Sequence, residues 1–96
     1  MIGLIATLRV KDGEAEAFED IFRELMGKVK AAEAGTLVYQ LTKSRTEANT
    51  YKVVELYQDQ AALDVHAKTD ELRGLLRSLG PHMVGRAEIE YLDAVV

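Results

Sequence analysis

The chain has 96 residues, of which 48% are hydrophobic and 29% charged, and its formal net charge is −4 at pH 7. This composition is typical of one globular domain, and an acidic balance without a basic cluster argues against nucleic acid as the main partner. The absence of cysteine excludes disulfides, thiolate zinc sites and cysteine nucleophiles. Because the N-terminal apolar run is too short for a signal peptide or a membrane span, we expect a cytoplasmic protein that does not enter the membrane.

The first half of the chain predicts a strand followed by a long helix. Apolar residues alternate over residues 2–10, as they do in a strand with one buried face. A helical period then runs over residues 14–34, with Asp12 or Gly13 as the N-cap and Gly35 as the C-terminal stop. One stripe of this helix is apolar and is expected to face the core: Phe18, Ile21, Phe22, Leu25 and Val29.

The second half predicts a hairpin, two short helices and a last strand. Alternating stretches at residues 36–44 and 51–57 are joined by a polar connection. Asp59 is a candidate N-cap for one helix, and Thr69 is a candidate N-cap for the next. A final alternating stretch covers residues 86–93. The apolar side of the second short helix carries four leucines: Leu72, Leu75, Leu76 and Leu79.

The predicted order is β-α-β-β-α-β, with the second helix broken in two. This order is the ferredoxin-like split βαβ arrangement, an α+β fold in which helices cover one face of a four-stranded antiparallel sheet. We interpret residues 1–96 as a single domain. Apolar residues occupy both faces of the first three strands, and the helices can cover only one of them. The sequence therefore predicts a homodimer in which two sheets face each other.

A motif begins on the third strand and continues into the helix after it: Glu55-Leu-Tyr57-x-Asp59-x-x-Ala62-Leu-x-x-His66-x-x-Thr69. Together with the length and the order of elements, the motif resembles the antibiotic biosynthesis monooxygenase (ABM) domain family, over essentially the whole chain. The resemblance implies a dimeric α+β barrel. Members of that family include cofactor-independent monooxygenases of quinols and polycyclic phenols, haem-degrading enzymes, and an isomerase of a phosphorylated signal sugar.

The chain departs from two branches of the family it resembles. Relatives of the quinol and isomerase type often carry a second histidine two residues after the threonine, where this chain has Glu71. The haem-degrading members resemble an Asn, Trp and His set. Here the corresponding places hold Ala6 or Thr7, His66, and Leu75 or Leu76, so we do not expect haem degradation.

His66 and Glu55 are the candidate catalytic residues. A histidine titrates near neutral pH, so His66 can take the proton of a phenolic or enediol hydroxyl, although a single buried histidine is often only a hydrogen-bonded core residue. Glu55 can orient His66 or bind a substrate hydroxyl, or it can pair with a lysine or arginine across the sheet or the dimer interface. Tyr57 and Tyr51 are candidate substrate-binding residues, as is Arg86.

No cofactor and no metal are expected. The glycines never form Gly-x-Gly-x-x-Gly after a strand, and the spacing of His66, His82 and Glu55 gives little support to a metal site. The first functional hypothesis is a small cofactor-independent monooxygenase acting on a quinol or polycyclic phenol. The alternatives are an isomerase, or a non-catalytic binding protein, for a small hydroxylated or phosphorylated metabolite. Every catalytic hypothesis requires that His66 and Glu55 face the same pocket, from which water is largely excluded.

Overall fold

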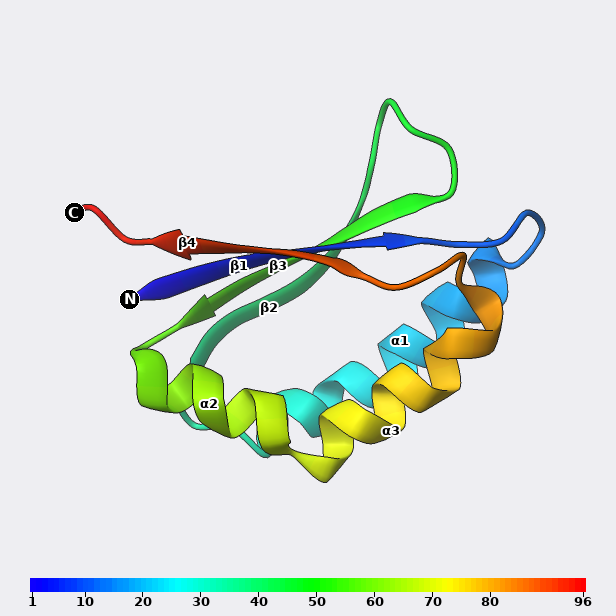
Figure 1. The fold of residues 1–96 in the computed structure, drawn as a ribbon. Coiled ribbons are helices and arrows are strands. Elements are labelled where there is room, and N and C mark those ends of the chain that lie inside the picture. Colours follow the sequence, from blue (N-terminus) through cyan, green and yellow to red (C-terminus); the bar gives the residue numbers. More distant parts are fainter.

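The computed structural model describes residues 1–96 and has one sheet, with the strand order β2-β3-β1-β4, whose neighbouring strands are all antiparallel. Three helices lie on one face of this sheet (Figure 1). The predicted α+β ferredoxin-like fold is therefore confirmed. In chain order the elements are β1 (Ile2–Arg9), α1 (Ala15–Ala31), β2 (Thr36–Lys43), β3 (Thr50–Tyr57), α2 (Gln60–Lys68), α3 (Asp70–Leu79), a short 3-10 helix (Gly80–His82) and β4 (Glu88–Asp93).

The inner face of the sheet forms one wall of the core. On β1 the residues Leu4, Ala6 and Leu8 point to the helices, and their partners on β3 are Glu55, Val53 and Tyr51. Alternation along residues 51–57 was correctly predicted, since every second residue there is buried. An acidic side chain consequently stands in the middle of an otherwise apolar wall.

The helices supply the other wall of the core. Phe18, Phe22 and Val29 of α1 are fully buried, as are Leu75 and Leu79 of α3. The predicted apolar sides of these two helices therefore do face the core. The remaining residues of each apolar side are partly exposed. Asp59 and Thr69 cap α2 and α3 as predicted: each side chain accepts a hydrogen bond from the backbone N–H three residues further on.

Three predicted boundaries were wrong. Helix α1 ends at Ala31 and not at residue 34, and its N-cap is Glu14, whose side chain makes no capping bond. Gly35 does not stop this helix: it passes against α2, where a Cβ atom would lie 2.5 Å from the Cβ of Ala62. The early end of α1 frees four residues to cross beneath α2. Strand β4 begins at Glu88, two residues later than predicted.

No helix covers the outer face of the sheet. On this face Ile5 lies opposite Val54, and Gly3 lies between Leu56 and Leu92. Apolar side chains therefore occupy both faces of the sheet, as the sequence indicated. The homodimer that this pattern suggests stays a prediction. None of the helices combines the length and the apolar character that crossing a lipid bilayer requires.

Candidate active site

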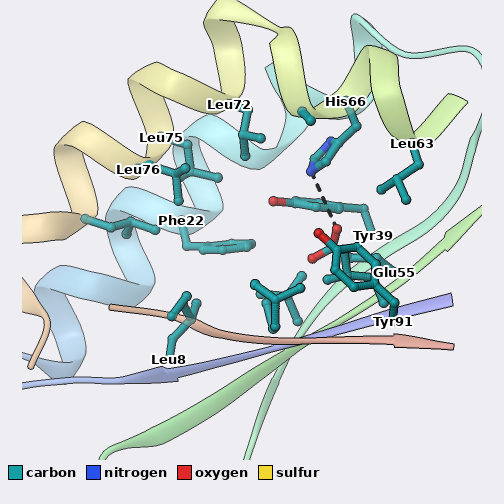
Figure 2. A pocket seen from close by; sticks show the side chains of 17 residues that line it. Leu8, Phe22, Tyr39, Glu55, Leu63, His66, Leu72, Leu75, Leu76 and Tyr91 are labelled. Carbon is teal, nitrogen blue, oxygen red and sulfur yellow. Dashed lines mark ion pairs between the residues drawn. The ribbon is translucent and has the colours of Figure 1, made fainter. Parts of the chain in front are cut away.

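A cavity of about 220 Å³ lies between the inner face of the sheet and the helices (Figure 2). Fifteen of its 17 lining residues are hydrophobic, and the other two are Glu55 and His66. The lining also includes exposed side chains of the edge strand β4 and of α3, namely Ile89, Tyr91 and Leu76. The cavity therefore opens between β4 and α3, and a ligand entering there would meet an apolar chamber with one polar side.

Local structure places His66 on the polar side of the cavity. The Asp59 cap fixes the start of α2, and His66 lies seven residues after it, which is about two helical turns. The imidazole consequently faces inward, on the same side of the helix as Leu63, and is buried. The rings of Tyr39 and Tyr57 pack against it, with centroids 5.4 and 5.1 Å from that of the imidazole.

The imidazole of His66 stands between two buried carboxylates. Its Nδ1 atom is 2.7 and 3.0 Å from the two carboxylate oxygens of Glu33, and its Nε2 atom is 3.5 Å from Oε1 of Glu55. The dashed line in Figure 2 marks the contact between His66 and Glu55. The structure thus brings the two predicted catalytic residues into one hollow. Their catalytic role stays a prediction.

Glu55 is set up to exchange a proton near neutral pH. The pKa of its carboxyl group is raised to about 7: burial is the main cause and the nearby charge of Glu33 adds to it, while the hydrogen bond donated by the Tyr57 hydroxyl partly opposes both effects. No lysine or arginine pairs with either carboxylate, so the alternative in which Glu55 is neutralised by a basic residue fails within this chain. A group that titrates near pH 7 is suited to acid–base catalysis.

The predicted substrate-binding residues do not line the cavity. Tyr57 is fully buried, and its hydroxyl is taken up by Glu55. Tyr51 packs on Phe18, with ring centroids 4.8 Å apart, and donates its hydroxyl hydrogen to Glu19. Arg86 is exposed in the loop before β4. Alternation along β3 correctly placed both tyrosines on the inner face, but it could not show that other side chains already occupy their hydroxyls.

His82 lies outside the cavity. Its Nδ1 atom is 3.4 Å from Oε1 of Glu14, and the 3-10 helix that carries it follows α3. His66, His82 and Glu55 are therefore not assembled around one point. No group of three or more histidine, aspartate or glutamate side chains is arranged to hold a metal ion.

Tyr39 is the first site residue that the sequence did not single out. Tyr51 and Tyr57 were the tyrosines predicted to bind substrate, but of the four tyrosines in the chain only Tyr39 and Tyr91 line the cavity. The Tyr39 hydroxyl points into the cavity and makes no hydrogen bond within the chain (Figure 2). Burial raises its pKa far above the ordinary value, and the charges of Glu55 and Glu33 add to this effect. Tyr39 thus remains a hydrogen-bond donor at any physiological pH.

Glu33 is the second missed residue. It lies just after α1, in the turn that leads to β2, and its side chain is only 1% exposed. The sequence did contain one signal: Glu33 is the only charged residue between Lys30 and Gly35, and a negative charge at a helix C-terminus opposes the helix dipole. An acid in such a place is either solvated or held by a specific partner, and here the partner is His66.

Comparison with known proteins agrees with this architecture. The profile of the family described as "Antibiotic biosynthesis monooxygenase" matches residues 1–77, which include Glu33, Glu55 and His66. The chain is a member of the antibiotic biosynthesis monooxygenase family. No curated protein matches it.

Solved structures of other proteins resemble this family member over nearly its whole length. A Caulobacter crescentus protein whose crystal structure bears the family's name is 50% identical, with a TM-score of 0.93 over 99% of this chain and 90% of that one. A Pseudomonas aeruginosa protein is 30% identical, with a TM-score of 0.83 over 99% and 94% of the two chains. A Nitrosomonas europaea protein is 17% identical with a TM-score of 0.89 over both full chains, so it shows the shared fold alone.

Proposed function

We propose that this family member is a small cofactor-independent monooxygenase that acts on a quinol or a polycyclic phenol. One observation carries the proposal: a proton-exchanging pair, His66 and Glu55, faces an apolar cavity whose lining contains no lysine or arginine. Such a cavity suits a flat, uncharged aromatic substrate with a hydroxyl group at one edge.

The proposed reaction begins with proton transfer from the substrate to the His66–Glu55 pair. The resulting anion is stabilised by the hydrogen bond that Tyr39 donates, and it gives one electron to dioxygen. For an anthrone, the radical and superoxide then combine at the carbon that lost its proton. The pair returns the proton to the resulting peroxide anion, which becomes a hydroperoxide. Loss of water from the hydroperoxide then leaves a quinone. Substrate and dioxygen thus become quinone and water, and the apolar walls keep bulk water from the anion.

Two alternatives receive less support. A phosphorylated ligand would meet two buried carboxylates, Glu33 and Glu55, without any cation on the cavity lining, and Arg86 lies outside it. A purely structural role for His66 would require no cavity beside it, but a cavity is present there. An uncharged hydroxylated substrate fits both observations.

We also propose that the working form is a homodimer. The support is the uncovered outer face of the sheet, on which Val38, Val54 and Leu92 are exposed. A second copy that packs its own sheet against this face would bury all three residues in both subunits, with the two cavities on opposite sides of the paired sheets. Sedimentation of the purified protein measures this directly, and a monomer at micromolar concentration would contradict it.

Oxygen uptake with reduced naphthoquinones and with anthrones tests the proposed activity. Wild-type protein should consume dioxygen, whereas His66→Ala and Glu55→Gln should lose most of the activity while keeping the wild-type circular dichroism spectrum. His82→Ala is the matched control, because it removes the other histidine of the chain without touching the cavity. Uptake that is absent in the wild type, or equal in wild type and His66→Ala, would contradict the proposal.

A further inference from the structure

We propose that Glu33 is the positioning residue of this site: it holds the His66 imidazole with the proton on Nδ1, so that Nε2 is free to accept the substrate proton. The proposal rests on the proposed function, because it assigns Nε2 of His66 as the atom that receives a proton. Glu33 does not line the cavity, so it acts through His66 and not on the substrate.

The contacts of Nδ1 determine the tautomer. This atom lies within hydrogen-bond distance of both carboxylate oxygens of Glu33. An ionised carboxylate only accepts hydrogen bonds, so Nδ1 must carry the hydrogen that is donated to it. In the neutral imidazole the other nitrogen, Nε2, is then a bare acceptor. That atom faces Glu55 at 3.5 Å, on the polar side of the cavity.

Three hydrogen bonds hold Glu33 in place. The Thr36 hydroxyl donates to its Oε1 at 2.7 Å, its backbone N–H donates to the Lys30 carbonyl at 3.2 Å, and its own carbonyl accepts from Thr36 N–H at 3.3 Å. The turn between α1 and β2 therefore fixes the carboxylate from one side, while α2 presents His66 from the other. Two elements that are far apart in the sequence define the orientation of one ring.

The electrostatic environment of Glu33 gives the arrangement a catalytic use. Burying a carboxylate without a cation is costly, and here His66 is the only group that can supply the positive charge. When Nε2 takes the substrate proton, an imidazolium forms between Glu33 and the substrate anion. The charge of Glu33 stabilises that imidazolium, as a carboxylate does for the histidine of a hydrolase triad.

The tautomer can be measured without any substrate. Long-range ¹H–¹⁵N correlation spectra show which nitrogen of a histidine carries the proton, and His82→Ala assigns the signals because the chain has only two histidines. Wild-type His66, followed from pH 6 to 9, should show a protonated Nδ1 throughout. In Glu33→Gln the amide can donate to Nδ1 as well as accept from it, so signals of the other tautomer should appear.

Kinetics test the consequence for the reaction. In Glu33→Gln, kcat for anthrone oxidation should fall by on the order of 100-fold, while KM changes less than about 3-fold because Glu33 does not touch the substrate. Glu33→Asp keeps the charge and should recover part of kcat. Glu19→Gln is the matched control: it removes a carboxylate that accepts a hydrogen bond from the core residue Tyr51 and that does not line the cavity.

The outcomes separate this proposal from the proposed function. A wild-type His66 protonated on Nε2 would overturn the role of Glu33, and this measurement needs no variant to fold. A folded Glu33→Gln with wild-type kcat would overturn it too. If the wild type shows the Nδ1 proton but no oxygen uptake with any quinol or anthrone, the positioning contact stands and the proposed oxygenase activity fails.

Discussion

Replacing Glu55 with glutamine should make the protein more stable at pH 8 and should have a much smaller effect on its stability at pH 5. The pKa of this carboxyl group rises from an ordinary value of 4.5 to about 7 on folding, mainly because the group is buried. Between these two pH values the native state holds a proton that the unfolded chain has released. The stability that this proton contributes is complete below pH 4.5 and is lost as the pH rises through 7.

The size of the effect follows from the change in proton affinity. Each pKa unit corresponds to about 1.4 kcal/mol, so ionisation of Glu55 lowers the free energy of unfolding by about 3 kcal/mol at pH 8. Glutamine resembles the protonated acid because it is uncharged, and its carbonyl oxygen can still accept the hydrogen bond from the Tyr57 hydroxyl. Glu55→Gln should therefore avoid this loss.

Urea unfolding of both proteins at one fixed concentration, from pH 5 to pH 8.5, measures the difference. Titrating groups far from Glu55 contribute equally to both proteins, so subtracting the two curves isolates Glu55 together with its neighbours His66 and Glu33. The difference should be about 1 kcal/mol at pH 5, where the unfolded carboxyl group is already mostly ionised, and should grow to about 3 kcal/mol at pH 8. Parallel curves, or a Glu55→Gln variant that is less stable at pH 8, would refute the reasoning from burial.

Three further predictions concern the walls of the site. Tyr39→Phe removes the hydrogen-bond donor that faces the cavity, so it should lower kcat/KM for phenolic substrates by about 10- to 100-fold. The melting temperature should not fall. An unchanged kcat/KM would contradict the role of Tyr39. Tyr57→Phe removes the hydrogen bond that lowers the pKa of Glu55, so the acid limb of the pH profile of kcat/KM should move to higher pH. A move to lower pH would contradict the assignment of this limb to Glu55. Gly35→Ala places a methyl group 2.5 Å from the Cβ of Ala62 and should cost about 1–3 kcal/mol in urea unfolding, whereas adding Ala62→Gly should restore most of that stability. If the double variant is no more stable than Gly35→Ala alone, the clash is not the cause.

Predictions from the sequence were reliable wherever a single hydrophobic period decided the structure. Alternation along β1 and β3 identified the buried side chains, including Glu55, because neighbouring residues of a strand point to opposite faces. The caps of α2 were equally local, since Asp59 bonds to a backbone N–H three residues away. These short-range features were enough to place His66 on the inward side of its helix.

Helix ends and long-range partners were harder to predict. The helical pattern around α1 continued to residue 34, but the helix ends at Ala31 because the following turn packs against α2 and carries Glu33 inward. The sequence favoured Tyr51 and Tyr57 over Tyr39 as substrate-binding residues. Only the packing of Glu19 and Glu55 against the first two hydroxyls left Tyr39 as the one facing the cavity.

The sequence by itself determined the fold, its uncovered apolar sheet face and the meeting of His66 with Glu55, because each depends on periodicity and on the order of elements along the chain. Only the tertiary structure decided that the imidazole lies between two carboxylates. Glu33 and His66 are 33 residues apart, and no local pattern links them. Their contact arises because α1 ends three residues early and α2 packs over the turn that follows, which depends on how whole elements pack together.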